Sequence, residues 1–426
     1  MTLALESAAQ TTVAFLDRLF ARKPLEHVSI KLWDGALWPD ETPRAATVDL
    51  KHPGSLRAML EGGNAKGLGE AFVRGDYDVE GDLEKAVEMA LALEDRPHGW
   101  LESLTNFYRV HRLPPGPRET AETAGKWKGS RHSPSRDRDV VSYHYDVSND
   151  FYQLWLDMEM AYSCAYFETP DTPLDAAQRA KFRMLCRKLR LRPGQRLLDI
   201  GCGWGGFARF AARTCGVEVL GITLSENQAA LAAQRTRDAG MSECVKIERR
   251  DYRHLESAGE FDAVASVGMA EHVGRENLKD YFATVRSLLK PGGVFLNHAI
   301  GEGRSEKRFQ GPSFIDAYVF PDSDIPPLPI VLVAAEDAGF EIRDVENLRE
   351  HYMLTLRHWV RRLEENREKA RSMVSDATYR VWRLYMAASA HGFDHGNLAI
   401  YQTLLAKPHA DGLANLPLTR RDWYEE

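Results

Sequence analysis

Short apolar runs alternate with helical patterns along the chain beyond residue 190. Each run is rich in aliphatic side chains and lies between turn or polar residues, which is typical of buried strands. Helical patterns fall between most of the runs. This alternation predicts an α/β fold with a doubly wound sheet. The predicted strands are residues 196–200, 217–223, 245–249, 261–267, 294–299, 340–345 and 399–406.

The first 112 residues have a different pattern, in which helical and strand-like stretches are mixed. We expect residues 1–112 to form a smaller α+β domain. Residues 113–140 begin with Leu113-Pro-Pro-Gly-Pro and continue as polar sequence, which is typical of an exposed linker. Residues 141–426 then form the predicted α/β domain. Within it, residues 301–329 are rich in Gly, Ser, Asp and Pro and make a long connection for an α/β fold.

Composition narrows the class of protein. Hydrophobic residues make up 44% and charged residues 27% of the 426, which is ordinary for a globular chain. No long apolar run and no basic, apolar leader is present, so neither a spanning helix nor a secretory signal is expected. The five cysteines are scattered without a C-x-x-C pair, which predicts no disulfide framework, no metal site and a cytoplasmic location. A net charge of −7 argues against a general nucleic-acid partner.

The segment Leu197-Leu-Asp-Ile-Gly-Cys-Gly-Trp-Gly-Gly-Phe207 has the pattern of a buried strand that enters a glycine turn and then a helix. Such a turn lets backbone N–H groups approach a nucleotide-like ligand, and the helix N-terminus adds partial positive charge. Gly201, Gly203 and Gly206 also fit the dinucleotide pattern G-x-G-x-x-G. The turn alone therefore leaves the ligand open, and it is also compatible with simple packing of a helix on a sheet.

Three features at the ends of neighbouring strands argue against a dinucleotide and for a ligand that has an amino group and an adenine. A dinucleotide site needs an acid at the end of the second strand, and residues 217–223 end without one. Asp199 lies just before the glycines, where a carboxylate can hold a cationic amino group. After the third strand, Asp251 and Tyr252 provide an acid and an aromatic ring for an adenine.

The sequence resembles the cyclopropane-fatty-acyl-phospholipid synthase family, which includes mycolic-acid cyclopropane synthases and related lipid C-methyltransferases. The resemblance covers about residues 141–410 and implies a class I methyltransferase fold, Rossmann-like, that binds S-adenosylmethionine. The motifs that carry it are Tyr143-His-Tyr-Asp-Val-Ser-Asn-Asp-Phe-Tyr152, Tyr162-Ser-Cys-Ala-Tyr-Phe167, Leu198-Asp-Ile-Gly-Cys-Gly-Trp-Gly205, Gly221-Ile-Thr-Leu-Ser-Glu-Asn-Gln228 and Met269-Ala-Glu-His-Val-Gly274. The donor-binding residues it implies are Tyr162, Ser163, Leu197, Leu198, Asp199, Ile200, Gly201, Cys202, Gly203, Trp204, Gly205, Thr223, Leu224, Ser225, Glu226, Asn227, Gln228, Asp251, Tyr252 and Arg253.

The same resemblance implies transfer of the sulfonium methyl to a cis double bond of an unsaturated phospholipid acyl chain, followed by closure of a cyclopropane ring. Closure requires a base, which the resemblance implies is a bound bicarbonate. An anion against a carboxylate needs a shared proton, so we expect a raised pKa for Glu271. The residues implied to hold the bicarbonate are Cys164, Glu271, His298, Ile300 and Tyr352.

Taken singly, these residues have simpler interpretations. A histidine at the end of an apolar strand is more often structural, a lone Cys164 is most simply a small buried hydrophobe, and Glu271 can favour a helix start. Only their occurrence together favours catalysis. A methyl-branched or methylene product remains an alternative, because it would use the same motifs. The loop Phe320-Pro-Asp-Ser-Asp324 departs from the family's Phe-Pro-Gly-Gly and leaves substrate details open.

A phospholipid substrate implies contact with a bilayer, at the inner face of the membrane. Residues 179–192 carry seven basic side chains among apolar ones, as a membrane-surface helix would. An ordinary helix packed on the sheet fits the pattern equally well. The resemblance also implies a homodimer and a lipid-associated first domain. A lipid-transfer protein and an NAD-dependent oxidoreductase are the disfavoured rivals.

Overall fold

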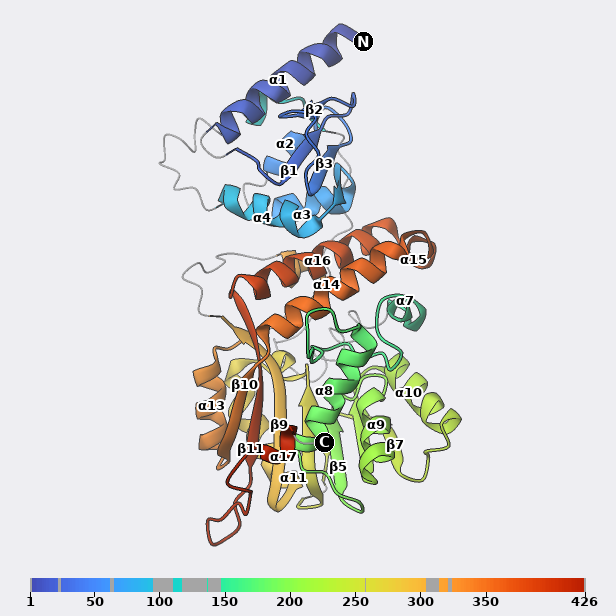
Figure 1. Cartoon of the computed structure of the whole chain (residues 1–426), viewed down its shortest axis with the longest axis vertical. Helices are drawn as coiled ribbons and strands as arrows, with labels where there is room; N and C mark the ends of the chain where they lie inside the picture. Colours follow the sequence, from blue (N-terminus) through green and yellow to red (C-terminus); the bar gives the residue numbers. More distant parts are fainter. Residues whose placement is uncertain are drawn as a thin grey trace. The chain divides into compact units, whose positions relative to one another are not determined.

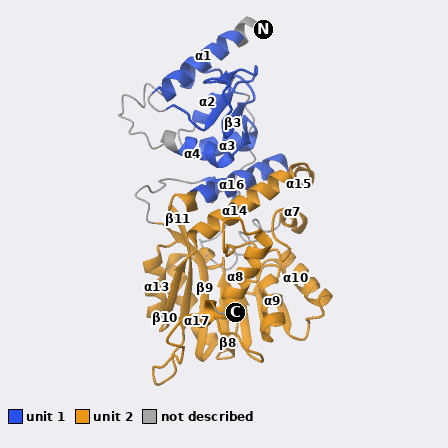
Figure 2. Cartoon of the chain, viewed as in Figure 1, with its two compact units in different colours: residues 1–126, 309–319, 374–391 blue, residues 127–308, 320–373, 392–426 orange. Residues whose placement is uncertain are grey.

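The computed structural model of the chain describes residues 2–21, 24–61, 65–94, 110–116, 136, 147–256, 258–303, 314–320 and 324–424 (Figure 1). The chain divides into two compact units (Figure 2). The first unit comprises residues 1–126, 309–319 and 374–391, and the second comprises residues 127–308, 320–373 and 392–426. The predicted linker, residues 113–140, lies largely outside the described residues, so the predicted domain limits stay a prediction.

The first unit contains a four-stranded sheet in the order β2-β1-β3-β4. Its strands are β1 Val28–Lys31, β2 Leu37–Trp38, β3 Ala46–Leu50 and β4 Tyr77–Gly81. Its helices are α1 Thr2–Phe20, α2 Ser55–Leu60, α3 Ala65–Arg74, α4 Leu83–Glu94, α12 Phe314–Tyr318 and most of α16 Asp376–Asp394. The mixed α and β content agrees with the sequence pattern of residues 1–112, and two segments from far along the chain complete the unit.

Buried ion pairs hold α16 against this sheet. Arg380 and Arg383 both donate to the carboxylate of Asp78 on β4, at 3.2 and 3.1 Å. Arg383 also donates to the carbonyl oxygen of Val79 at 2.8 Å. All three charged side chains are buried. Burying a carboxylate or a guanidinium group alone costs free energy, and the pairing offsets this cost.

Removing Asp78 should therefore weaken the first unit. We expect Asp78→Ala to lower local stability around β4 and α16 by about 3 kcal/mol, because two buried guanidinium groups lose a buried anionic partner, although Arg380 keeps its ion pair with Asp376. Hydrogen-exchange mass spectrometry on the full chain would report this as lost amide protection in those two elements. The matched control is Glu88→Ala, which removes the exposed pair with Lys85 and should change protection by less than about 1 kcal/mol. Unchanged protection in Asp78→Ala would show that the buried pair adds no net stability.

The second unit contains a seven-stranded sheet in the order β10-β11-β9-β8-β5-β6-β7. Strands β7, β6, β5, β8 and β9 run parallel, and β11 pairs antiparallel with β9 and β10. All seven predicted strands are confirmed, at β5 Arg196–Ile200, β6 Glu218–Thr223, β7 Val245–Arg249, β8 Phe261–Val267, β9 Leu289–Glu302, β10 Glu341–Asn347 and β11 Leu398–Ala406. Strand β9 starts earlier than predicted, because Pro291-Gly-Gly293 has the composition of a turn but lies within an irregular stretch of the strand.

Helices surround this sheet. The α-helices are α7 Asn149–Gln153, α8 Leu174–Lys188, α9 Gly206–Cys215, α10 Glu226–Asp238, α11 Leu278–Leu288, α13 Leu328–Asp337, α14 Arg349–Glu365, α15 Arg367–Met373 and α17 Arg421–Tyr424. Three short 3₁₀ turns lie after strands or beside helix starts, at η1 Tyr252–His254, η2 Ala270–His272 and η3 Arg275–Asn277. The predicted long connection, residues 301–329, includes α12 and partly lies outside the described residues.

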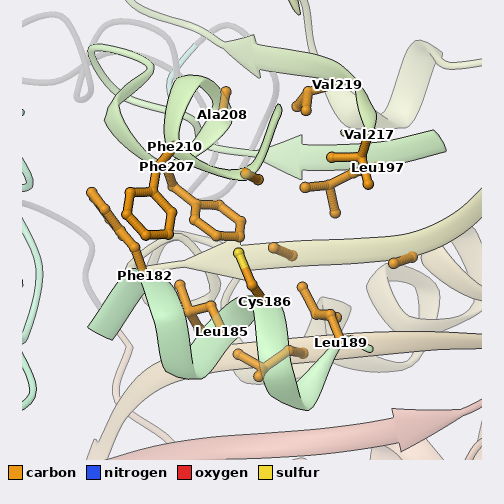
Figure 3. Packing of buried hydrophobic residues seen from close by; sticks show 14 of the residues in the cluster. Phe182, Leu185, Cys186, Leu189, Leu197, Phe207, Ala208, Phe210, Val217 and Val219 are labelled. Atoms are coloured by element: carbon orange, nitrogen blue, oxygen red, sulfur yellow. The ribbon is translucent and has the colours of Figure 1, made fainter. Parts of the chain in front are cut away.

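Alternate side chains of β5 enter two different cores. Leu197 packs with α8 and α9 on one face of the sheet, where Phe182 and Phe207 belong to the same cluster (Figure 3). Leu198 packs with α11 on the other face. Because side chains alternate along a strand, Asp199 shares the face of Leu197 and is directed to the α8 side. This geometry positions a carboxylate next to a helix rich in basic residues.

Helix α8 packs on the sheet and is not the membrane-surface helix that its composition allowed. Its apolar side chains Phe182, Leu185 and Leu189 belong to the core, so they are unavailable to a bilayer. Lys181 and Lys188 are each only 1% exposed, and Lys188 forms an ion pair with Glu346. Among the described residues, no helix is long and apolar enough to cross a membrane.

Candidate functional site

A pocket of about 270 Å³ lies in the second unit at the carboxyl ends of β5, β6 and β8. The glycine turn after β5 forms part of its wall. Gly201, Gly203 and Gly205 have φ values of 75°, 54° and 74°, which favour glycine at these positions. A Cβ on Gly206 would approach the carbonyl oxygen of Glu159 to 2.6 Å. Both observations explain why the turn is built from glycine.

Most of the predicted donor-binding residues line this pocket. They come from four separate segments, namely the stretch before α8, the turn after β5, the end of β6 and the loop after β7. Those that line it are Tyr162, Ser163, Asp199, Ile200, Gly201, Cys202, Gly203, Trp204, Thr223, Leu224, Gln228, Asp251, Tyr252 and Arg253.

Six predicted residues lie outside the pocket lining. Leu197 and Leu198 are buried in the two cores of the sheet, and Gly205 is the N-cap of α9. Ser225 caps α10 by accepting a hydrogen bond from the backbone N–H of Gln228. Glu226 and Asn227 are exposed on the first turn of that helix. A contiguous motif necessarily includes side chains that point away from the ligand, because strands and helices turn their residues to opposite sides.

Asp199 is a buried carboxylate with unused capacity for hydrogen bonds. Its side chain is 2% exposed, and Oδ2 has no hydrogen-bond partner in the described part of the chain. Burial raises the pKa of Asp199 to about 7, against a smaller lowering by the charge of Lys181. A carboxylate in this state gains strongly from a cationic partner entering the pocket.

Several lining residues were not predicted. Lys181, Phe182 and Leu185 come from α8, and Asp280 and Thr284 come from α11. Further unpredicted lining residues are Met160, Ala161, Gly206, Phe207, Ile222, Arg250, Val267, Gly268, Met269, His272, Val273, Asn277 and Tyr281. Some of these residues lie within the motifs quoted from the sequence, namely Gly206, Phe207, Ile222, Met269, His272 and Val273. The positions on α8 and α11 carry no local sequence signal for a ligand.

The loop after β7 is pre-ordered by an internal ion pair. Arg253 donates to both carboxylate oxygens of Asp251, with a shortest distance of 2.7 Å. Burial acts to raise the pKa of Asp251, but the hydrogen bonds from Arg253 lower it overall. Tyr252 meets Tyr281 edge-on with ring centroids 5.5 Å apart. The acid and the ring are thus fixed beside the pocket wall.

The five residues implied to hold a base are not in the lining of the pocket. Three of them adjoin it, because the lining residues Ser163 and His272 are chain neighbours of Cys164 and Glu271, and Val267 pairs in register with His298. Glu271 Oε1 accepts a hydrogen bond from the backbone N–H of Ile300 at 2.7 Å. His298 Nδ1 lies 3.1 Å from the amide nitrogen of Gln402, its register partner on β11. Within the described residues, Glu271 Oε2 and His298 Nε2 are buried without a hydrogen-bond partner. Two polar atoms are therefore left for a ligand or a water.

Cys164 and Tyr352 both approach the carbonyl of Leu348, the residue before α14. The thiol of Cys164 donates to its neighbour's carbonyl at Ala165, 3.2 Å away, and lies 3.8 Å from the carbonyl of Leu348. Tyr352 donates its backbone N–H to the same Leu348 carbonyl. The N–H of Leu348 in turn bonds the carbonyl of Ile400, which pairs in register with Ile300. All five residues are thereby linked through β9, β11 and α14.

Burial sets the protonation of these groups. It raises the pKa of Glu271 to about 7 and lowers the pKa of His298 well below its ordinary value. Burial alone thus raises the pKa of Glu271, and the rise expected from a bound anion stays a prediction. Burial also raises the pKa of Cys164, so this residue is a thiol and not a thiolate nucleophile.

A buried aromatic cluster connects the pocket to Tyr352. Tyr162, which lines the pocket, has its ring centroid 5.1 Å from that of Trp359. Trp359 in turn lies 6.0 Å from Tyr352. Tyr152 adds a contact with Trp204 at 4.9 Å. Aromatic faces tolerate a nearby cation, so this cluster suits a site at which positive charge develops.

The unusual acid Asp324 has a structural function. It accepts a bidentate ion pair from Arg275, with distances of 2.7 and 3.0 Å. Its backbone N–H also donates to the carbonyl oxygen of Glu271 at 3.2 Å. Asp324 therefore holds the end of this loop against the segment that carries Glu271. Residues 321–323 of the same loop lie outside the described residues.

The fold and the pocket define the class of protein to which this chain belongs. A parallel sheet with an antiparallel β11, a glycine turn after β5 and a buried acid before it are the features of a class I S-adenosylmethionine-dependent methyltransferase. The mycolic acid cyclopropane synthetase family model matches residues 132–403, more than half of the chain. The protein belongs to this family.

Individual relatives agree. A probable fatty acid methyltransferase of Pseudomonas putida is 44% identical over 93% of this chain and 95% of its own. Cyclopropane-fatty-acyl-phospholipid synthase of Escherichia coli K12 is 33% identical over 86% of this chain and 90% of its own. The solved structure of mycolic acid cyclopropane synthase CmaA1 complexed with SAH and CTAB has a TM-score of 0.60 and 33% identity, and covers 63% of this chain and 97% of its own. The family acts by methylating lipid acyl chains with S-adenosylmethionine.

The pKa of Asp199 predicts a pH dependence of donor binding. The ligand-free carboxyl group has a pKa of about 7, and an ammonium partner would lower it. Binding then releases a proton, so affinity for S-adenosylhomocysteine should fall as pH drops below 7, by up to about tenfold per unit. Calorimetric titrations between pH 6 and 7.5 would measure this slope.

Asp199→Asn is the matched variant for this experiment. We expect it to bind at least about tenfold more weakly at pH 7.5. It should also lose the slope. An equal slope in the variant and the parent protein would assign the titration to another group.

Proposed function

We propose that this protein methylates a cis double bond of an unsaturated phospholipid acyl chain and closes it to a cyclopropane ring. The observation that carries this proposal is the burial of Glu271 and His298, each with a polar atom that has no hydrogen-bond partner among the described residues. Their neighbours His272 and Val267 line the pocket that suits the methyl donor. Methyl transfer alone needs no base, because the sulfonium is already activated. A preformed polar site beside the pocket indicates that a proton must be removed afterwards.

The same site fits bicarbonate. Glu271 Oε2 and His298 Nε2 are unpartnered acceptor or donor atoms in the described part of the chain, and the Ile300 backbone lies against Glu271. A carboxyl group with a pKa of about 7 can share a proton with an oxyanion, which removes the repulsion between like charges. The neutral imidazole of His298 adds a second polar contact without adding charge.

When bound, S-adenosylmethionine supplies an electrophilic methyl group, and bicarbonate supplies the base that takes up a proton. Asp199 would hold the donor's ammonium, while Tyr162 and Trp204 enclose the reacting centre. The aromatic cluster excludes water and tolerates the cation that forms on the acyl chain. Glu271 and His298 would hold the base at the position of the new methyl group.

A methyl-branched or methylene product is the second candidate. The Pseudomonas putida relative is described as a probable fatty acid methyltransferase, and this description is compatible with either product. The ring and the methylene both form when the cation loses a proton from the transferred methyl, the methylene after a hydride shift along the chain. A saturated methyl branch instead needs a hydride from a reductant. The buried Glu271 and His298 support a product formed by proton loss.

We further propose that the protein works as a homodimer on the inner face of the membrane. Its substrate is a bilayer phospholipid, so the acyl chain must be reached from the lipid surface. The core packing of α8 excludes the apolar face of that helix as the membrane contact.

Expression in a bacterial host that lacks its own synthase tests the product directly. Acyl chains would be analysed by mass spectrometry and proton NMR. We expect a mass gain of one CH₂ together with cyclopropane ring protons. The same gain with methylene protons, or a gain of CH₄ with a branched methyl signal, would establish the second candidate instead.

Glu271→Gln tests the role of the buried carboxyl group. We expect kcat to fall by about 10²-fold to 10⁴-fold, because an uncharged amide cannot share a proton with the base. Affinity for S-adenosylhomocysteine should change by no more than about twofold, since Glu271 lies outside the pocket lining. The exposed Glu276→Gln, five residues along, is the control and should leave both quantities unchanged. Equal losses of turnover and binding in Glu271→Gln would make Glu271 a donor-site residue.

A further inference from the structure

Helix α8 directs an almost fully buried lysine into the pocket. Lys181 is 1% exposed and lines the pocket. Its ammonium group donates one hydrogen bond, to Ser163 Oγ at 2.6 Å. One turn earlier, Gln178 donates to the carbonyl oxygens of Ala161 and Ser163 at 3.1 and 2.9 Å. The helix therefore fixes both the lysine and the strip of chain that its ammonium contacts.

The charge of Lys181 has no counterion within the described residues. No carboxylate there lies within 4.0 Å of Nζ. Asp157 is close enough to influence the lysine, but its two oxygens accept from the backbone N–H groups of Ala161 and Glu159. The other neighbour of Nζ is the ring of Phe182, whose centroid lies 4.9 Å away. Neither Ser163 nor Phe182 carries a charge, so the ammonium group is costly to bury. It can still donate to an anion in the pocket.

Lys181 and Asp199 together form a complementary pair for a zwitterion. Both are buried, both line the same pocket, and they carry opposite charges without forming an ion pair with each other. The amino acid end of S-adenosylmethionine carries an ammonium and a carboxylate on one carbon. Asp199 accounts for the ammonium only, which leaves the carboxylate without a partner.

We propose that Lys181 binds the carboxylate of the donor's methionine moiety, with Ser163 orienting the ammonium group. This inference rests on the proposed function, because it assumes that S-adenosylmethionine occupies the pocket. The pocket then selects a ligand that has both charged groups of an amino acid. Lys181 is a binding residue and takes no part in the proton transfer.

A matched pair of ligands tests this assignment without turnover. S-adenosylhomocysteine carries both groups, and its decarboxylated analogue keeps only the primary amine. We expect the full-length parent protein to bind S-adenosylhomocysteine at least about tenfold more tightly than the analogue in calorimetric titrations. Equal affinities would overturn the proposal before any variant is made.

Lys181→Met then tests whether this preference for a ligand with a carboxylate depends on Lys181. It should weaken S-adenosylhomocysteine binding by about 30-fold or more and change binding of the analogue by less than about threefold. Lys181→Gln, which keeps a polar side chain for Ser163, should give the same pattern if the methionine variant folds poorly. Arg183→Met is the control, since Arg183 is an exposed cation on the same helix.

The outcomes separate this inference from the proposed function. Equal loss for both ligands in the Lys181 variants would make the lysine a structural residue and overturn the inference, while leaving the donor in place. No loss for either ligand would also overturn it. Failure of the parent protein to bind S-adenosylhomocysteine would instead contradict the proposed function.

Discussion

Burial of polar groups at the carboxyl edge of the seven-stranded sheet is the constraint on which this structure depends. Asp199, Lys181, Glu271 and His298 are all at least nine-tenths buried. Each retains hydrogen-bonding capacity that the described residues do not fill. Unpaired polar groups at such depth are costly to fold, so they persist where a ligand completes them. The arrangement of these buried groups therefore indicates the size and charge of the ligand.

The sheet and its helices place these groups by simple rules. Side-chain alternation sends Leu197 and Asp199 to the face covered by α8, and the helix returns Lys181 to the same place. The antiparallel strand β11 places Gln402 opposite His298. The amide nitrogen of Gln402 contacts Nδ1 of the imidazole, and Nε2 is left for a ligand. Donor pocket and base site are therefore neighbours because β5, β8 and β9 are adjacent in the sheet.

Much of this was predictable from sequence. Strands buried on both faces appear as apolar runs, which made the central strands of the large sheet predictable. The edge strands β7 and β10 are partly exposed and mix polar with apolar residues, so turn residues and the neighbouring helical patterns were needed to find them. The glycine turn and Asp199 were also found, because their spacing is local. Lys181 was missed because a lysine on an amphipathic helix has the same pattern whether it faces water or a pocket. The contact of Arg380 with Asp78 was equally hidden, since it joins residues 302 positions apart.

The central claim is that Glu271 and His298 form a site for a bicarbonate base next to the donor pocket. The most direct test is the rate of acyl-chain conversion on unsaturated phospholipid vesicles after dissolved carbon dioxide and bicarbonate have been removed. The proposed mechanism predicts that the rate falls sharply and recovers when bicarbonate is added back. A rate that does not depend on bicarbonate would contradict it.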